Sequence, residues 1–111
     1  MQFSLPQGGG NMNKPCYSDY IRHAIRFYAR YITKTQFRSA VDRANWLACH
    51  NAIQRYSARD KDILAYVYGA FDTLGDNVYV MAKKYHINQN IIWDMMKDFE
   101  REVAIERGLW E

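Results

Sequence analysis

Apolar residues recur at three- and four-residue steps from Ser18 to Arg107, and no segment alternates apolar and polar residues as a half-buried strand does. Such spacing places the apolar side chains on one face of a helix. The chain has 111 residues, of which 49% are hydrophobic, so it can bury the core of one domain. We therefore predict an all-α fold of about five helices, forming a single helical domain over residues 18–111.

Two helices are expected in the first half of this domain. The first begins at Ser18, a capping residue, and its apolar face is formed by Ile21, Ile25, Tyr28 and Ile32. After a break at residues 33–35, the second covers about residues 38–54. Trp46 lies beside its expected buried stripe, which consists of Val41, Ala44, Leu47, Ala48 and Ile53.

Three more helices are expected in the second half. Ser57 is the N-cap of the first, and Asp60 follows at the spacing of a capping box. The apolar face of this helix is formed by Ile63, Leu64, Val67 and Tyr68. A connection at residues 72–76 leads to a short helix over about residues 76–85. The last helix covers about residues 88–107, and Gly108 ends it, as a glycine just past a helix often does.

Several classes of protein are disfavoured by what the sequence lacks. Cys16 and Cys49 stand far apart without a CxxC pair, so we expect reduced thiols in a cytoplasmic protein rather than a disulfide framework or a zinc site. There is no glycine-rich phosphate loop and no catalytic Ser/His/Asp or Cys/His constellation, which argues against an enzyme, a cofactor and a bound metal. No stretch approaches the roughly 20 apolar residues of a membrane span.

The first 17 residues are expected to form a flexible N-terminal tail. They lack the basic region and the sustained apolar region of a signal peptide. A glycine run at residues 8–10 is followed by Asn11 and Met12, and purine-rich bacterial ribosome-binding sequences translate into such glycine runs. Residues 1–11 are therefore interpreted either as an over-extended reading frame before a natural start at Met12 or as an expression scar.

The run from Met81 to Val103 carries the pattern of a helix-turn-helix. This motif needs a small residue where the two helices approach each other and apolar residues that fill the wedge between them. Ala82 is the small residue, and the wedge is filled by Met81, Tyr85, Ile87, Ile92 and Met95. His86 occupies the turn position and tolerates a left-handed backbone, while Asn88 caps the second helix. The sequence therefore predicts a helix-turn-helix at about residues 76–107.

The segment from Tyr56 to Arg107 resembles the C-terminal promoter-reading region of bacterial sigma factors. The resemblance is carried by SARDKDIL, by TLGDN and by VYVMAKKYHINQNIIWDMMKDFERE. Met81-Ala82 matches the Ile-Ala pair of the family and His86-Ile87 matches its Gly-Ile. The cap, the following Val and a later core position of the family are matched by Asn88, Ile92 and Phe99.

The resemblance implies a DNA-binding regulator of transcription, of the small type found in phages and conjugative or other mobile elements. Double-stranded DNA is the implied partner, and RNA polymerase is a further one. The chain is too short to hold the promoter-melting domains of a full sigma factor. Its oligomeric state is left open, because no segment has the pattern of a dimer seam.

The expected DNA contacts fall into two groups. The positions that should enter the groove are Asn88, Gln89, Asn90, Trp93 and Lys97. The positions that should hold phosphates are Lys83 and Lys84, at the end of the first motif helix, and a ladder on the first helix of the domain formed by Arg22, Arg26 and Arg30. The alternative for the ladder is a solvated face or pairing with the acidic last helix.

The charge distribution supports a second hypothesis. Residues 88–111 hold six acids and three bases, a balance of −3, whereas residues 12–62 hold ten bases and four acids, a balance of +6. The fold could therefore be a protein-interaction module, an accessory or inhibitory protein whose acidic last helix docks on a basic partner. Trp93 is either packed within the chain or an anchor for such a partner.

Overall fold

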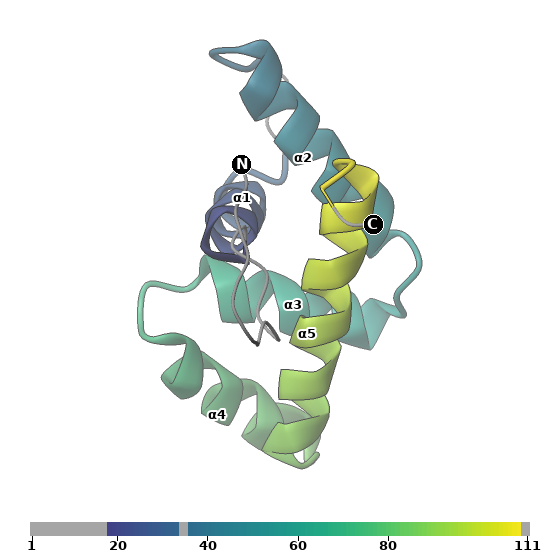
Figure 1. Ribbon diagram of the computed structural model, residues 1–111. Helices are drawn as coiled ribbons and strands as arrows, with labels where there is room; N and C mark the ends of the chain where they lie inside the picture. The colour runs from purple at the N-terminus through teal and green to yellow at the C-terminus, as the bar shows by residue number, and fades with distance from the viewer. Residues whose placement is uncertain (1–17, 34–35, 110–111) are drawn as a thin grey trace, which may run out of the picture.

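The computed structural model describes residues 18–33 and 36–109, so the expectations for the N-terminal tail and for Cys16 lie outside the described residues. The described residues contain no strand and form five helices, which confirms the all-α prediction (Figure 1). These are α1 (Ser18–Arg30), α2 (Ala40–Ile53), α3 (Ala58–Gly69), α4 (Leu74–Tyr85) and α5 (Gln89–Glu106).

Hydroxyl side chains cap the starts of α2, α3 and α4. The hydroxyl oxygens of Ser39, Ser57 and Thr73 each accept a hydrogen bond of 3.1 Å from the backbone N–H three residues later. As a result α2 begins two residues later than predicted and α4 begins two residues earlier, while the predicted cap of α3 is confirmed. The glycine predicted to end the last helix, Gly108, has a φ of +74°.

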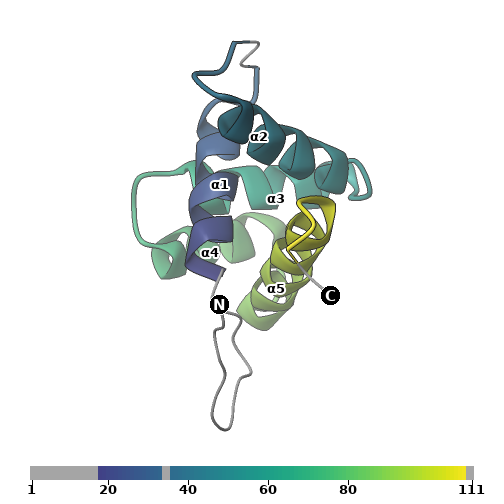
Figure 2. The same cartoon turned by 45° about the horizontal axis from the view of Figure 1, so that its top comes forward.

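Buried residues from all five helices form one core. The long helix α5 extends from α4 at one end of the molecule to α2 at the other, and α3 crosses it between them (Figure 1). Helices α1 and α2 pack against each other, and both also contact α5 (Figure 2). The core therefore holds α4 and the start of α5 at one end of the molecule (Figure 1).

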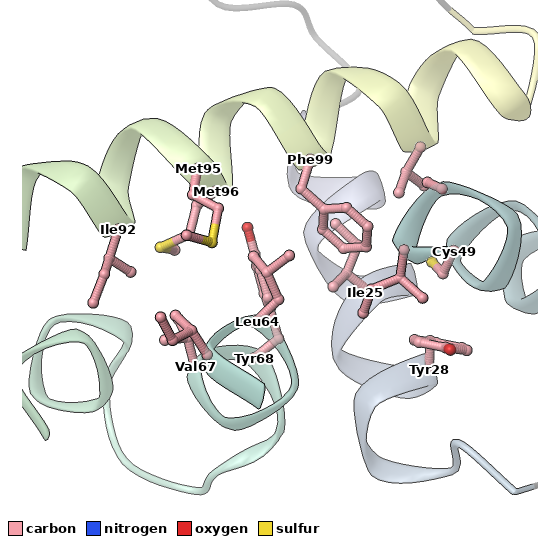
Figure 3. Close-up of a cluster of buried hydrophobic side chains, with 14 of the residues drawn as sticks. Ile25, Tyr28, Cys49, Leu64, Val67, Tyr68, Ile92, Met95, Met96 and Phe99 are labelled. Atoms are coloured by element: carbon pink, nitrogen blue, oxygen red, sulfur yellow. The ribbon is translucent and has the colours of Figure 1, made fainter. Parts of the chain in front are cut away.

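The centre of the core lies between α5 and α3. Figure 3 shows Ile92, Met95, Met96 and Phe99 pointing from α5 toward Leu64, Val67 and Tyr68 of α3. The ring of Phe99 meets the ring of Tyr56 edge-on, with centroids 5.7 Å apart. Each of the larger apolar side chains contributes about 1.5–3 kcal/mol by leaving water. The packing of α5 on α3 fixes the orientation of α5, whose first turns carry the predicted DNA-reading residues.

The buried stripe of α2 differs from the prediction. Val41 is 53% exposed, and the residues that α2 buries are Asn45, Ala48, Cys49, Ala52 and Ile53. The physical reason is the polar Asn45, whose Oδ1 accepts hydrogen bonds from Tyr20 and Arg107 and so faces inward. Ile32 is also exposed, because α1 ends two residues before it.

Candidate nucleic-acid interface

The turn between α4 and α5 is closed by backbone hydrogen bonds. His86 has φ 55° and ψ 46°, the left-handed conformation predicted for this position. The N–H of Ile87 donates to the carbonyl of Ala82 at 3.0 Å, as in a Schellman motif. This bond satisfies a carbonyl that the end of α4 would leave free, and it turns the chain directly into α5.

The residues predicted to fill the wedge between the helices are packed. Met81, Ala82, Ile92 and Met95 are buried, and Tyr85 and Ile87 are partly buried against the core. Asn88 caps α5 as predicted, because its Oδ1 accepts a 2.7 Å hydrogen bond from the N–H of Asn90. The first turn of α5 is thereby fixed relative to α4, with its outer face open to solvent.

An open hollow lies in the angle between α4 and the start of α5. It is lined by Tyr79, Ala82, Lys83, Ile87, Asn88, Gln89 and Asn90. The Nζ of Lys83 lies 5.5 Å from the ring centroid of Tyr79, and both side chains are exposed. Tyr79 was not among the predicted contacts, although its position four residues before Lys83 places the two on one face of a helix.

The outer face of α5 carries the remaining predicted contacts. Gln89, Asn90, Trp93 and Lys97 are all exposed, and Trp93 keeps 36% of its surface open. Arg101, which was not predicted, continues the four-residue spacing of three of them. We call Gln89, Trp93, Lys97 and Arg101 the α5 stripe, because successive members lie four residues apart and are neighbours on the helix surface. The stripe turns about 120° around the helix over its length. The stripe contains no acidic residue.

The two lysines at the end of α4 differ in their surroundings. The Nζ of Lys84 lies 2.8 Å from Oδ2 of Asp62 on α3, and the hydroxyl of Tyr85 donates to the same oxygen. The hydrogen bond with Lys84 is the main cause of a lowered pKa for Asp62, and it also raises the pKa of Lys84. Lys84 therefore has a partner within the chain, whereas Lys83 borders the hollow.

The arginine ladder on α1 is largely engaged within the fold. The Nε of Arg22 lies 2.8 Å from Oε2 of Glu100 on α5. At the other end of the ladder, Arg30 donates to the carbonyl of Gly69 at 3.0 Å and stacks on the ring of Phe71, 3.9 Å from its centroid. Arg26, between them, is partly buried. Arg22 and Arg30 thus each have a partner within the chain, on α5 and at the end of α3, while Arg30 itself stays exposed.

Glu100 accepts a second hydrogen bond, of 2.6 Å, from the hydroxyl of Tyr68. Burial would lower the pKa of Arg22, but the hydrogen bond and charge of Glu100 outweigh it and raise the pKa. The pKa of Tyr68 is raised well above its usual value, first by burial and then by the charge of Glu100. These three side chains, here called the Glu100 cluster, link α1, α3 and α5.

Of the other acidic residues of α5, two form ion pairs with an arginine and two are exposed to solvent. Arg55 forms ion pairs with Glu106 at 2.7 Å and with Glu102 at 3.7 Å. Asp94 and Asp98 remain exposed on the outer face, beside the two cations of the α5 stripe. Three of the acids that make the end of the chain negative therefore face basic residues of α1 and the α2–α3 connection. The outer face itself holds balanced charges.

Three further features of the described residues concern metal-binding groups, membrane-spanning helices and the thiol of Cys49. The described part of the chain contains no group of three or more His, Cys, Asp or Glu residues placed to hold a metal ion. None of its helices is long and apolar enough to cross a membrane. Cys49 is fully buried, and burial raises the pKa of its thiol to about 12.

Comparison of the chain with protein family models, with curated proteins and with solved structures found no match. The resemblance to sigma factors therefore rests on the motifs of the sequence alone.

Proposed function

We propose that this protein is a DNA-binding transcription regulator of the sigma-like helix-turn-helix type, from a phage or other mobile element. The observation that carries the proposal is the set of exposed polar side chains around the α4–α5 turn. Gln89 and Asn90 stand at the open first turn of α5, Lys83 borders the hollow beside them, and Lys97 follows along the α5 stripe. Such a face combines groups that bind base edges with groups that bind phosphates.

The geometry of a helix in the major groove assigns these residues different tasks. The major groove admits an α-helix, and the first turns of a recognition helix contact base edges. Gln89, Asn90 and Trp93 take that part in the proposal. Lys83, Lys97 and Arg101 contact the phosphates on either side of the groove. RNA polymerase enters as a further partner through the resemblance to sigma factors.

The pairing of the acids in α5 removes much of the electrostatic objection to this role. Glu100, Glu102 and Glu106 already have basic partners within the chain. The positive charge of a neighbouring arginine offsets the negative charge of each glutamate, so a paired glutamate repels a phosphate less than an unpaired one does. The remaining repulsion comes from Asp94 and Asp98, which are exposed on the face next to the stripe.

The same two aspartates favour the second candidate function. They share a face of α5 and are exposed, as is the neighbouring Trp93, and acidic and aromatic groups of this kind bind a basic protein segment. Under this hypothesis Asp94→Lys with Asp98→Lys weakens the binding of that partner. Under the DNA hypothesis the same change strengthens DNA binding, because it replaces two negative charges near the phosphates with positive ones.

Fluorescence anisotropy of a labelled mixed-sequence duplex at several salt concentrations tests the proposal. We expect binding that weakens steeply with salt, with a slope of about −0.9 on a log–log plot for each phosphate neutralised. Lys83→Gln and Lys97→Gln should each reduce the magnitude of the slope by about 0.9. Arg43→Gln is the matched control, because Arg43 is an exposed cation on α2 at the opposite end of the molecule from α4 (Figure 1). Absence of binding at low salt would contradict the proposal.

A further inference from the structure

We propose that the α4–α5 unit prefers A·T base pairs, with Gln89 and Asn90 reading adenine and Trp93 contacting the methyl group of thymine. The inference rests on the proposed DNA-binding function and specifies its target. It starts from the residue types that the fold exposes at the beginning of α5. Two carboxamides and an indole occupy the base-facing turns, and the first cation of the α5 stripe comes later in the helix.

The side chains of Asn88, Gln89 and Asn90 differ in whether they already form a hydrogen bond within the chain. Asn88 uses its Oδ1 to accept the N–H of Asn90, so its side chain is held by the cap. Gln89 and Asn90 are the first two residues of α5, and their side chains are exposed. A carboxamide offers one acceptor and two donors, which match the N6 amino group and the N7 acceptor of adenine. Guanine presents two acceptors at the same edge, so its O6 would face the carboxamide oxygen unfavourably.

Trp93 supplies the apolar contact. It lies one turn after Gln89 on the α5 stripe and keeps 36% of its surface open. The C5-methyl of thymine is the apolar group that the major groove presents, and it attracts apolar side chains. Four residues advance a helix by about 6 Å, close to two base-pair steps of 3.4 Å. The adenine and thymine contacts are therefore expected on base pairs about two steps apart.

Guanine has no comparable partner at the start of the α5 stripe, and Lys83 of α4, which borders the same hollow, is assigned to a phosphate. Its commonest specific contact is an arginine or lysine that binds both O6 and N7. In the α5 stripe the first cation is Lys97, eight residues after Gln89 and so about 12 Å further along the helix. At that distance from the first turn, Lys97 is placed to bind a phosphate and is too far away to reach the base pair that Gln89 contacts. The same fold with an arginine at the start of α5 would favour G·C pairs.

Competition anisotropy with matched duplexes tests this preference. Two competitors of equal length share their flanks and differ in the centre, which consists of A·T pairs in one and G·C pairs in the other. The A·T duplex should bind about tenfold more tightly, equivalent to about 1.4 kcal/mol. Because A·T tracts also differ in shape, chemical probes are needed to separate contact from shape. Replacing adenine with 7-deazaadenine removes N7, and replacing thymine with uracil removes the methyl group.

We expect a several-fold loss of affinity from 7-deazaadenine at one or two central positions, and a smaller loss from uracil near them. Gln89→Ala and Asn90→Ala should each abolish the 7-deazaadenine effect at one position, and Trp93→Ala should abolish the uracil effect. Gln36→Ala, at an exposed glutamine before α2, is the control and should change neither. Equal binding of the two duplexes, or no response to 7-deazaadenine, overturns the preference while the DNA-binding function stands. No salt-dependent binding to any duplex overturns both.

Discussion

Replacement of Glu100 by alanine should lower the free energy of unfolding by about 3 kcal/mol. One carboxylate oxygen of Glu100 accepts both the guanidinium of Arg22 at 2.8 Å and the hydroxyl of Tyr68 at 2.6 Å. The side chain of Glu100 is 14% exposed and that of Arg22 is 33% exposed, while Tyr68 is 0% exposed. The variant therefore removes the acceptor of a buried hydroxyl and the carboxylate that pairs with a half-buried cation.

The magnitude follows from these burial values. Leaving the Tyr68 hydroxyl without a partner in the core costs about 1–3 kcal/mol. Arg22 is near the surface, so losing its ion pair removes about 1 kcal/mol rather than the roughly 3–5 kcal/mol of a fully buried pair. Glu100→Gln keeps an acceptor for Tyr68 and loses only the charge. It should therefore reduce stability by about 1–1.5 kcal/mol.

Urea denaturation at neutral pH, followed by circular dichroism, measures both values. The dependence of the unfolding free energy on urea should stay unchanged, because neither variant alters the surface exposed on unfolding. Asp98→Ala is the matched control, since Asp98 is an exposed acid on the same helix, and it should change stability by less than about 0.5 kcal/mol. A Glu100→Ala variant as stable as this control would refute the reasoning.

Three further predictions follow from other contacts. Arg22→Gln should lower the unfolding free energy by about 1 kcal/mol and leave the salt slope of DNA binding unchanged, because its guanidinium is held by Glu100. His86→Gly should raise the unfolding free energy by about 0.5–1 kcal/mol in a thermal melt, because a φ of 55° strains any residue with a Cβ. The pKa values of Cys49 and Tyr28 rise to about 12 from their usual 9.0 and 10.0, chiefly through burial. The unfolded chain therefore releases these protons first, and stability measured in urea should fall as pH rises from about 9 to about 12.

The parts of the fold that depend on nearby residues could be predicted from the sequence. The cap at Ser57, the turn at His86 and the cap at Asn88 each involve contacts within a few residues, and all three occur in the structure. The face of α2 could not be predicted in the same way. Asn45 is buried because Arg107, 62 positions away, donates to it at 2.6 Å. A polar residue with such a distant partner looks solvent-exposed to any rule based on spacing.

The same limit applies to the electrostatics of the proposed interface. The net charge of −3 over residues 88–111 would represent the outer face of α5 only if all of these charged side chains pointed toward that face. Asp98 and Glu100 are two residues apart and so point about 200° apart around the helix. Asp98 faces solvent, while Glu100 meets Arg22, which precedes it by 78 residues. In the proposed complex the potential at the DNA is therefore set by Lys83, the α5 stripe and the two exposed aspartates. The salt dependence of the proposed binding should report that face rather than the charge of the chain.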